Sequence, residues 1–165
     1  MSNDTIAGSG LVKMFYGQIL SILVIIPLVG WIAAIVGIVL FLVGLHEAAG
    51  ADEGYRTAFY VEIGILVLSV LAVFIGVLNI VTSILSLVVI YLVCTTTAGL
   101  LEVKGDLGTA ARGRFAWKFY GGCTALVVVC SILSLIPLVN ILAMVVIVPA
   151  SIASVVGGIL LLIFL

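Results

Sequence analysis

The sequence predicts an all-α membrane protein whose six transmembrane helices form three tandem helical hairpins. Of its 165 residues, 65% are hydrophobic and 8% are charged, whereas soluble domains are roughly half apolar and about a quarter charged. The charged residues gather at 1–13, 46–56, 102–106 and 112–118, and Glu62 is the one near-exception. The apolar intervals between these stretches are long enough to cross the hydrocarbon core, which takes about 20 helical residues.

The first hairpin is predicted at about residues 5–46. Pro27, followed three residues later by Gly30, favours a turn over a kink. Residues 14–45 would also make a single helix of about 48 Å at 1.5 Å per residue. Five or four spans in all are therefore the alternatives to six.

The second and third hairpins are predicted at about 56–103 and 114–165. Each is more than twice as long as a helix needs to be to cross a hydrocarbon core of about 30 Å, so each must fold back on itself. Asn79 marks the turn of the second hairpin, and the Pro137–Asn140 segment marks that of the third. The last helix is expected from about 140 to 165, tilted or kinked at Pro149.

A sequence repeat supports the hairpin arrangement. Each apolar block opens with a basic residue shortly before Phe-Tyr: Lys13 in the first block, Arg56 in the second and Lys118 in the third. Ile-Pro-Leu-Val stands at both 26–29 and 136–139. The sequence thus predicts an internal repeat of three hairpins.

The distribution of basic residues predicts the orientation. With six spans, both termini and both polar connections lie on the side that carries all 6 Lys and Arg residues. By the positive-inside rule that side is cytoplasmic. The N-terminus lacks the basic region of a cleavable signal peptide, so the first segment is expected to remain in the mature chain. We expect a multi-pass protein of the plasma membrane with cytoplasmic N- and C-termini.

Polar residues inside the spans are the candidates for chemistry. An ionisable group such as Glu62 points by default to a function, although its place near a helix end also fits interfacial anchoring. His46 ends the second helix close by in this topology, but its adjacency to Glu47 is not a ligand spacing. A threonine run could line a pathway or join helices. The candidate polar site comprises Glu62, His46, Thr95, Thr96 and Thr97.

Small residues four apart predict close helix packing. Such ladders form flat faces on which another backbone can approach. In the last helix the stripe follows Ala150, Ser154 and Gly158, and Leu161 lies off it. The candidate packing residues are Gly30, Ala33, Ala34, Gly37, Ala72, Gly76, Ala150, Ala153, Ser154, Gly157 and Gly158.

The residues that metal binding, catalysis or nucleic-acid binding would require are missing from the sequence. Cys94, Cys123 and Cys130 read as packing residues, because a metal site needs further ligands and His46 is remote in sequence. We expect no metal, no cofactor and no enzymatic activity, since no known catalytic motif is present. A net charge of −1 does not predict the basic surface that nucleic-acid binding needs.

The chain resembles a broad set of small, functionally unassigned polytopic membrane proteins of bacteria and archaea. The resemblance is carried by Ile26 to Gly30, by Gly54-Tyr55-Arg56-Thr57-Ala58-Phe59 and by Gly105-Asp106-Leu107-Gly108. It implies a compact helical protein of a prokaryotic envelope and assigns no catalytic residue.

The sequence therefore favours a non-enzymatic integral membrane protein, a structural or accessory subunit of a membrane assembly or a homo-oligomer. Its expected partners are the lipid bilayer and either further copies of itself or other membrane subunits. The alternative is a small channel or transporter built from hairpin repeats.

Overall fold

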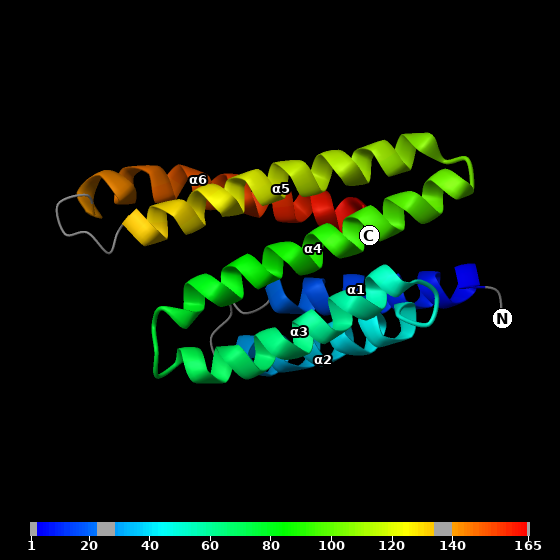
Figure 1. Ribbon diagram of the computed structural model, residues 1–165, viewed down its shortest axis with the longest axis horizontal. Coiled ribbons are helices and arrows are strands. Elements are labelled where there is room, and N and C mark those ends of the chain that lie inside the picture. Colours follow the sequence, from blue (N-terminus) through cyan, green and yellow to red (C-terminus); the bar gives the residue numbers. More distant parts are fainter. Residues whose placement is uncertain (1–2, 23–28, 134–139, 165) are drawn as a thin grey trace. The chain divides into compact units, whose positions relative to one another are not determined.

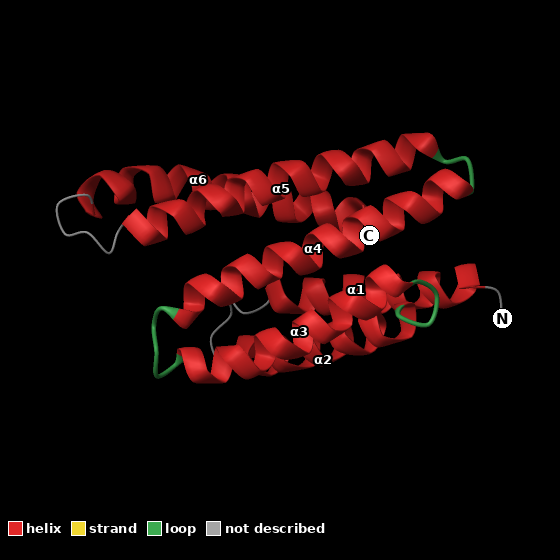
Figure 2. Cartoon of the chain, in the orientation of Figure 1, coloured by secondary structure: helices red, strands yellow, loops and turns green. Residues whose placement is uncertain are grey.

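The structure is a computed structural model that describes residues 3–22, 29–133 and 140–164, and these residues form six helices (Figures 1 and 2). The all-helical fold predicted from the sequence is confirmed. The helices are α1 (Asn3–Ile22), α2 (Val29–Ala48), α3 (Glu53–Ala72), α4 (Leu78–Val103), α5 (Leu107–Leu133) and α6 (Asn140–Phe164).

Four of the described helical segments are long and apolar enough to cross a membrane: Glu53–Ala72, Leu78–Val103, Leu107–Leu133 and Val146–Phe164. Ile32–Ala48, within α2, is a shorter apolar helix. The fold is therefore that of a multi-pass helical membrane protein.

The chain divides into two compact units, Met1–Tyr60 and Val61–Phe164. In the first unit, α1 and α2 lie side by side and run in opposite directions (Figure 1). The largest fully buried side chains of this unit are Met14, Leu45 and Tyr55. They come from α1, α2 and the first turn of α3, so all three elements contribute to this core.

In the second unit, α5 packs against both α4 and α6 in antiparallel fashion (Figure 1). The rings of Tyr91 on α4 and Trp117 on α5 meet edge to face, with their centroids 4.9 Å apart. The geometry is the one that aromatic quadrupoles favour. Small residues such as Ala110 and Ala116 are buried on α5, which lets the neighbouring helices approach closely.

The connection between α4 and α5 is tighter than the sequence indicated. Gly105 has a φ of +83°, and its N–H donates to the Glu102 carbonyl at 3.0 Å. The Asp106 N–H donates to the Leu101 carbonyl at 3.0 Å, which completes a Schellman ending of α4. Asp106 Oδ1 then accepts from the Thr109 N–H at 3.0 Å and caps α5. Because of this cap, α5 begins at Leu107, well ahead of the start predicted near 114.

The turn between α3 and α4 also differs from the prediction. It occupies residues 73–77, ahead of Asn79, which lies in the first turn of α4. The Asn79 carbonyl accepts hydrogen bonds from the hydroxyls of Thr82 and Ser83, at 3.0 and 2.8 Å. Gly76 lies in this connection rather than in α3.

The remaining predicted turns fall largely outside the described residues. Pro27 lies in segment 23–28 and Pro137 in segment 134–139, and neither segment is described. The last helix, expected from about 140 to 165, is observed as Asn140–Phe164, with Pro149 inside it.

Candidate packing and polar sites

The closest helix contact in the first unit brings backbone against backbone at Gly10 and Gly44. A Cβ added to Gly10 would lie 2.5 Å from the Gly44 carbonyl oxygen and 2.8 Å from the Ala48 nitrogen. A Cβ added to Gly44 would lie 2.5 Å from the Gly10 carbonyl oxygen and 2.8 Å from the Met14 nitrogen. Neither position can carry a side chain unless the two helices separate.

A second contact of the same kind lies one heptad further along. A Cβ at Gly17 would lie 2.6 Å from the Gly37 carbonyl oxygen and 2.8 Å from the Phe41 nitrogen. Gly10 and Gly17 are seven residues apart, as are Gly37 and Gly44. A seven-residue spacing keeps the same face of each helix toward its neighbour in left-handed packing.

The residues predicted for packing on α2 lie on or beside this contact. Gly30, Ala33 and Gly37 are buried, whereas Ala34 is half-buried. The four-residue ladders found part of the face, but the repeat that the helix pair uses is seven residues long. Sequence reasoning missed Gly10, Gly17 and Gly44, and the spacing of Gly30, Gly37 and Gly44 was the signal that could have found them.

An ion pair joins α1 and α2 beside the Gly10–Gly44 contact. Lys13 Nζ lies 2.6 Å from Glu47 Oε1, and the Ser9 hydroxyl donates to Glu47 Oε2 at 3.0 Å. Both oxygens of the carboxylate are therefore engaged. Because Lys13 and Glu47 are 34 residues apart, sequence inspection could not pair them.

The structure places His46 and Glu62, two of the predicted polar residues, in different units. His46 is exposed, and its ring lies 5.0 Å from that of Phe59. Glu62 is half-buried on α3, and its carboxylate forms no hydrogen bond or ion pair with another described residue. Within the described part of the chain, no group of three or more His, Cys, Asp and Glu residues could hold a metal ion.

The threonine run lies on α4 and bonds to its own helix. The Thr95 hydroxyl donates to the Tyr91 carbonyl at 2.6 Å, and the Thr97 hydroxyl donates to the Val93 carbonyl at 2.7 Å. Thr97 is buried, and Thr95 and Thr96 are half-buried. Hydroxyls that return to the carbonyl one turn earlier satisfy themselves locally.

Among the small residues predicted to pack on α6, Gly157 lies against α5, whereas Gly158, on the predicted stripe, lies further from it. A Cβ at Gly157 would lie 3.1 Å from Tyr120 Cα, whereas a Cβ at Gly158 would meet only Tyr120 Cε2 at 3.9 Å. Leu161, predicted to lie off the stripe, is 3% exposed. The contact therefore follows Ala150, Gly157 and Leu161, spaced seven and four residues apart. Ala150 and Gly157 are buried, and Ala153, Ser154 and Gly158 are half-buried.

The two small residues predicted on the third helix are placed apart. Ala72 ends α3 and is buried, with 5% exposure. Gly76 is exposed, and a Cβ added there would meet open space.

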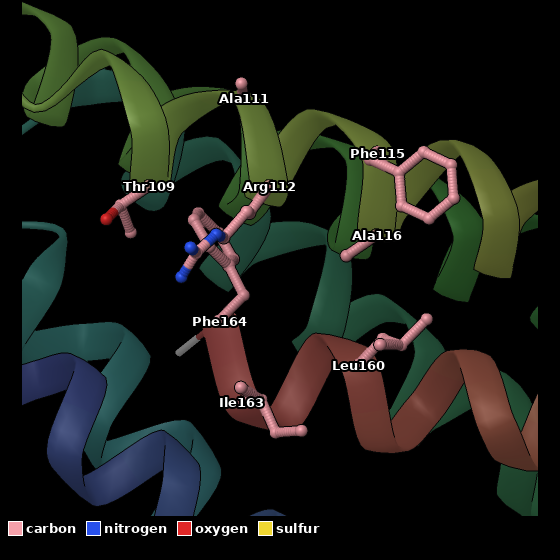
Figure 3. Close-up of a pocket in the computed structure, with 8 residues that line it drawn as sticks. All are labelled: Thr109, Ala111, Arg112, Phe115, Ala116, Leu160, Ile163 and Phe164. Carbon is pink, nitrogen blue, oxygen red and sulfur yellow. The ribbon is translucent and has the colours of Figure 1, made fainter.

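A pocket of about 400 Å³ lies between the first turns of α5 and the last turns of α6 (Figure 3). Figure 3 shows Arg112 reaching from α5 toward Phe164 at the end of α6, and Leu160 and Ile163 also line the pocket from α6. The lining is Thr109, Ala111, Arg112, Phe115, Ala116, Leu160, Ile163 and Phe164.

The neighbouring arginine has a different role. Arg114 forms an ion pair with Glu102, which joins the end of α4 to α5. Arg112 makes no salt bridge with a carboxylate in the part of the chain that the structure describes. Sequence analysis did not single out this pocket, because its two walls are about fifty residues apart in the chain.

The chain matches no protein-family model, no curated protein and no solved structure.

Proposed function

We propose that this is a non-enzymatic integral membrane protein that works through helix packing, as a structural or accessory subunit of a membrane assembly or as a homo-oligomer. The observation that carries the proposal is the hydrogen bonding of the hydroxyl groups inside the spans. The buried Thr124 hydroxyl on α5 has no hydrogen-bond partner among the described residues. Six other hydroxyls donate to carbonyls of their own helices, so they are satisfied locally instead of lining a path for a substrate. These donors are Ser69, Ser86, Thr95, Thr97, Ser131 and Ser154.

The surface of the spans supports association. Between 17% and 28% of the residues in each hydrophobic window are buried, so most of every span is left for lipid or for other chains. Large apolar side chains such as Val67, Val70 and Ile152 are more than half exposed. Such faces fit a bilayer, and they also fit neighbouring membrane subunits.

The proposed topology has six spans in the plasma membrane, with α1 and α2 forming the first hairpin. Both termini and the connections at 49–52 and 104–106 then lie in the cytoplasm. The positive-inside rule supports this orientation, since all 6 Lys and Arg residues lie toward that side. The backbone contact between α1 and α2 supports two spans there, because the two helices pack closely against each other as an antiparallel pair.

A small channel or transporter is the second candidate. It is favoured by Glu62, a half-buried carboxylate within a predicted span that forms no hydrogen bond or ion pair with another described residue. An ionisable group placed in this way is a functional hypothesis in its own right.

Purification in mild detergent from the native membrane tests the two candidates against each other. We expect a homo-oligomer, or a complex with a defined membrane subunit, when the mass is measured by native mass spectrometry. A monomer that supports ion flux in liposomes, with the flux lost in a folded Glu62→Gln variant, would replace the first proposal with the second.

A further inference from the structure

The pocket between α5 and α6 combines a cationic rim with an apolar wall. Arg112 and Thr109 supply a guanidinium and a hydroxyl, and Phe115, Leu160 and Ile163 supply hydrocarbon. A volume of about 400 Å³ falls within the range of small-molecule sites, about 300–1,000 Å³.

The floor beside Arg112 is fixed by a tight contact between the two helices. A Cβ added to Gly113 would overlap the ring of Phe164, so this ring lies directly against the α5 backbone. The Phe164 ring therefore lines the pocket where it meets the α5 backbone. The absence of a side chain at Gly113 is what leaves room for it.

The charges around Arg112 leave it available to an anion. Glu102, the carboxylate at the end of α4, is engaged by Arg114. Asp106 attracts Arg112 electrostatically, but its hydrogen bonds come from the backbone N–H and the hydroxyl of Thr109. An anionic ligand would therefore gain a guanidinium that no described carboxylate already pairs.

The position of the pocket along the helix corresponds to the headgroup level of a bilayer. With 27 residues, α5 is about 40 Å long, roughly 10 Å longer than the hydrocarbon core. Arg112 lies in the second turn of this helix, and its long side chain can reach the headgroups while its stem stays among apolar groups.

We propose that this pocket binds one anionic glycerophospholipid of the surrounding bilayer. The phosphate lies against the Arg112 guanidinium, and an acyl chain lies along Phe115, Leu160 and Ile163. Guanidinium groups match phosphate oxygens in planar, two-pronged geometry. Basic pockets between transmembrane helices at the headgroup level are suited to such lipids. A free phosphate would leave the apolar wall without a ligand, so the lipid is the better fit.

Lipid titration of the delipidated, full-length protein in non-ionic detergent tests this proposal. Native mass spectrometry would count bound dioleoyl-phosphatidylglycerol and dioleoyl-phosphatidylcholine, with inorganic phosphate as a competitor. We expect one tightly bound phosphatidylglycerol, preferred over phosphatidylcholine and not displaced by equimolar phosphate.

Three variants locate the site. Arg112→Gln should weaken phosphatidylglycerol binding roughly fivefold, the factor expected when one basic contact with an anionic headgroup is lost. Lys118→Gln removes the same charge from the same helix outside the pocket and should change the affinity little. Ile163→Ser, at a position 78% exposed, should weaken binding of both lipids. Circular dichroism and elution volume check that each variant is folded.

Equal effects of Arg112→Gln and Lys118→Gln would overturn the proposal, because binding would then follow overall charge. Equal binding of the two lipids to the unmodified protein would also overturn it. Displacement of phosphatidylglycerol by equimolar phosphate would assign the site to a free anion instead of a lipid.

Discussion

Gly10 and Gly44 hold α1 and α2 together backbone to backbone, since a Cβ on either residue would lie 2.5 Å from the carbonyl oxygen of the other. Two backbones that approach this closely, with no side chain between them, gain dispersion and weak Cα–H···O interactions that a larger residue would prevent. The relationship joins two residues 34 positions apart and fixes the register of the first hairpin.

Gly10→Val should destabilise the first unit by about 1–3 kcal/mol or more, because overpacking at this contact must separate two backbones. Gly8→Val is the matched control, since a Cβ at Gly8 would meet nothing within 4 Å. The change in helix propensity is the same in both variants and cancels in the comparison. Thermal unfolding in detergent measures the difference, and equal midpoints would mean that this contact does not form.

Gly157→Leu should disturb the α5–α6 pair more than Gly158→Leu. The added side chain at 157 would meet the Tyr120 backbone from 3.1 Å, whereas at 158 it would start 3.9 Å from the edge of the Tyr120 ring. Unfolding midpoints of the two variants check the order. A larger loss for Gly158→Leu would restore the stripe predicted from the sequence.

The Lys13–Glu47 pair should contribute only within the weak range of surface ion pairs, since its side chains are 38% and 39% exposed and water screens such pairs. A double-mutant cycle with Lys13→Gln and Glu47→Gln measures the coupling. The coupling should shrink as salt rises. Coupling that exceeds this range, or that ignores salt, would contradict a screened surface pair.

Acid should weaken the start of α5. The N–H of Thr109 donates to Asp106 and lowers the pKa of this carboxyl below its usual 3.8. A lowered folded-state pKa means that the stabilisation is present above pH 3.8 and is lost as the pH falls through the folded value. Unfolding midpoints between pH 7 and pH 2 should fall more steeply for the unmodified protein than for Asp106→Asn. Parallel curves would argue against this cap.

Cysteine labelling tests the six-span topology in a background without the native cysteines. Single cysteines at Gly50 and Gly108 should react from the cytoplasmic side, and one at Phe74, in the exposed α3–α4 connection, should react from outside. A cysteine at Asn3 should react with the first two. External labelling at Asn3 would make the first block a single span and leave five helices across the membrane.

The sequence by itself determined the class of this protein: all-helical, multi-pass and membrane-embedded. Apolar runs separated by confined charges carry that information locally, because a helix satisfies its own backbone wherever lipid excludes water. The local sequence also contains the signal for the start of α5, in Gly105 and Asp106. The charged residues that follow led to a predicted start that was too late.

Only the tertiary structure decided which small residues meet and which charges pair. Gly10 meets Gly44, Gly157 meets Tyr120, and Lys13 meets Glu47, because the register between helices sets each contact. That register depends on the fit of whole helix faces to one another, and alternative faces of the same apolar helix differ little in composition. Local spacing therefore identified faces able to pack, while the fitted backbones selected the faces that do.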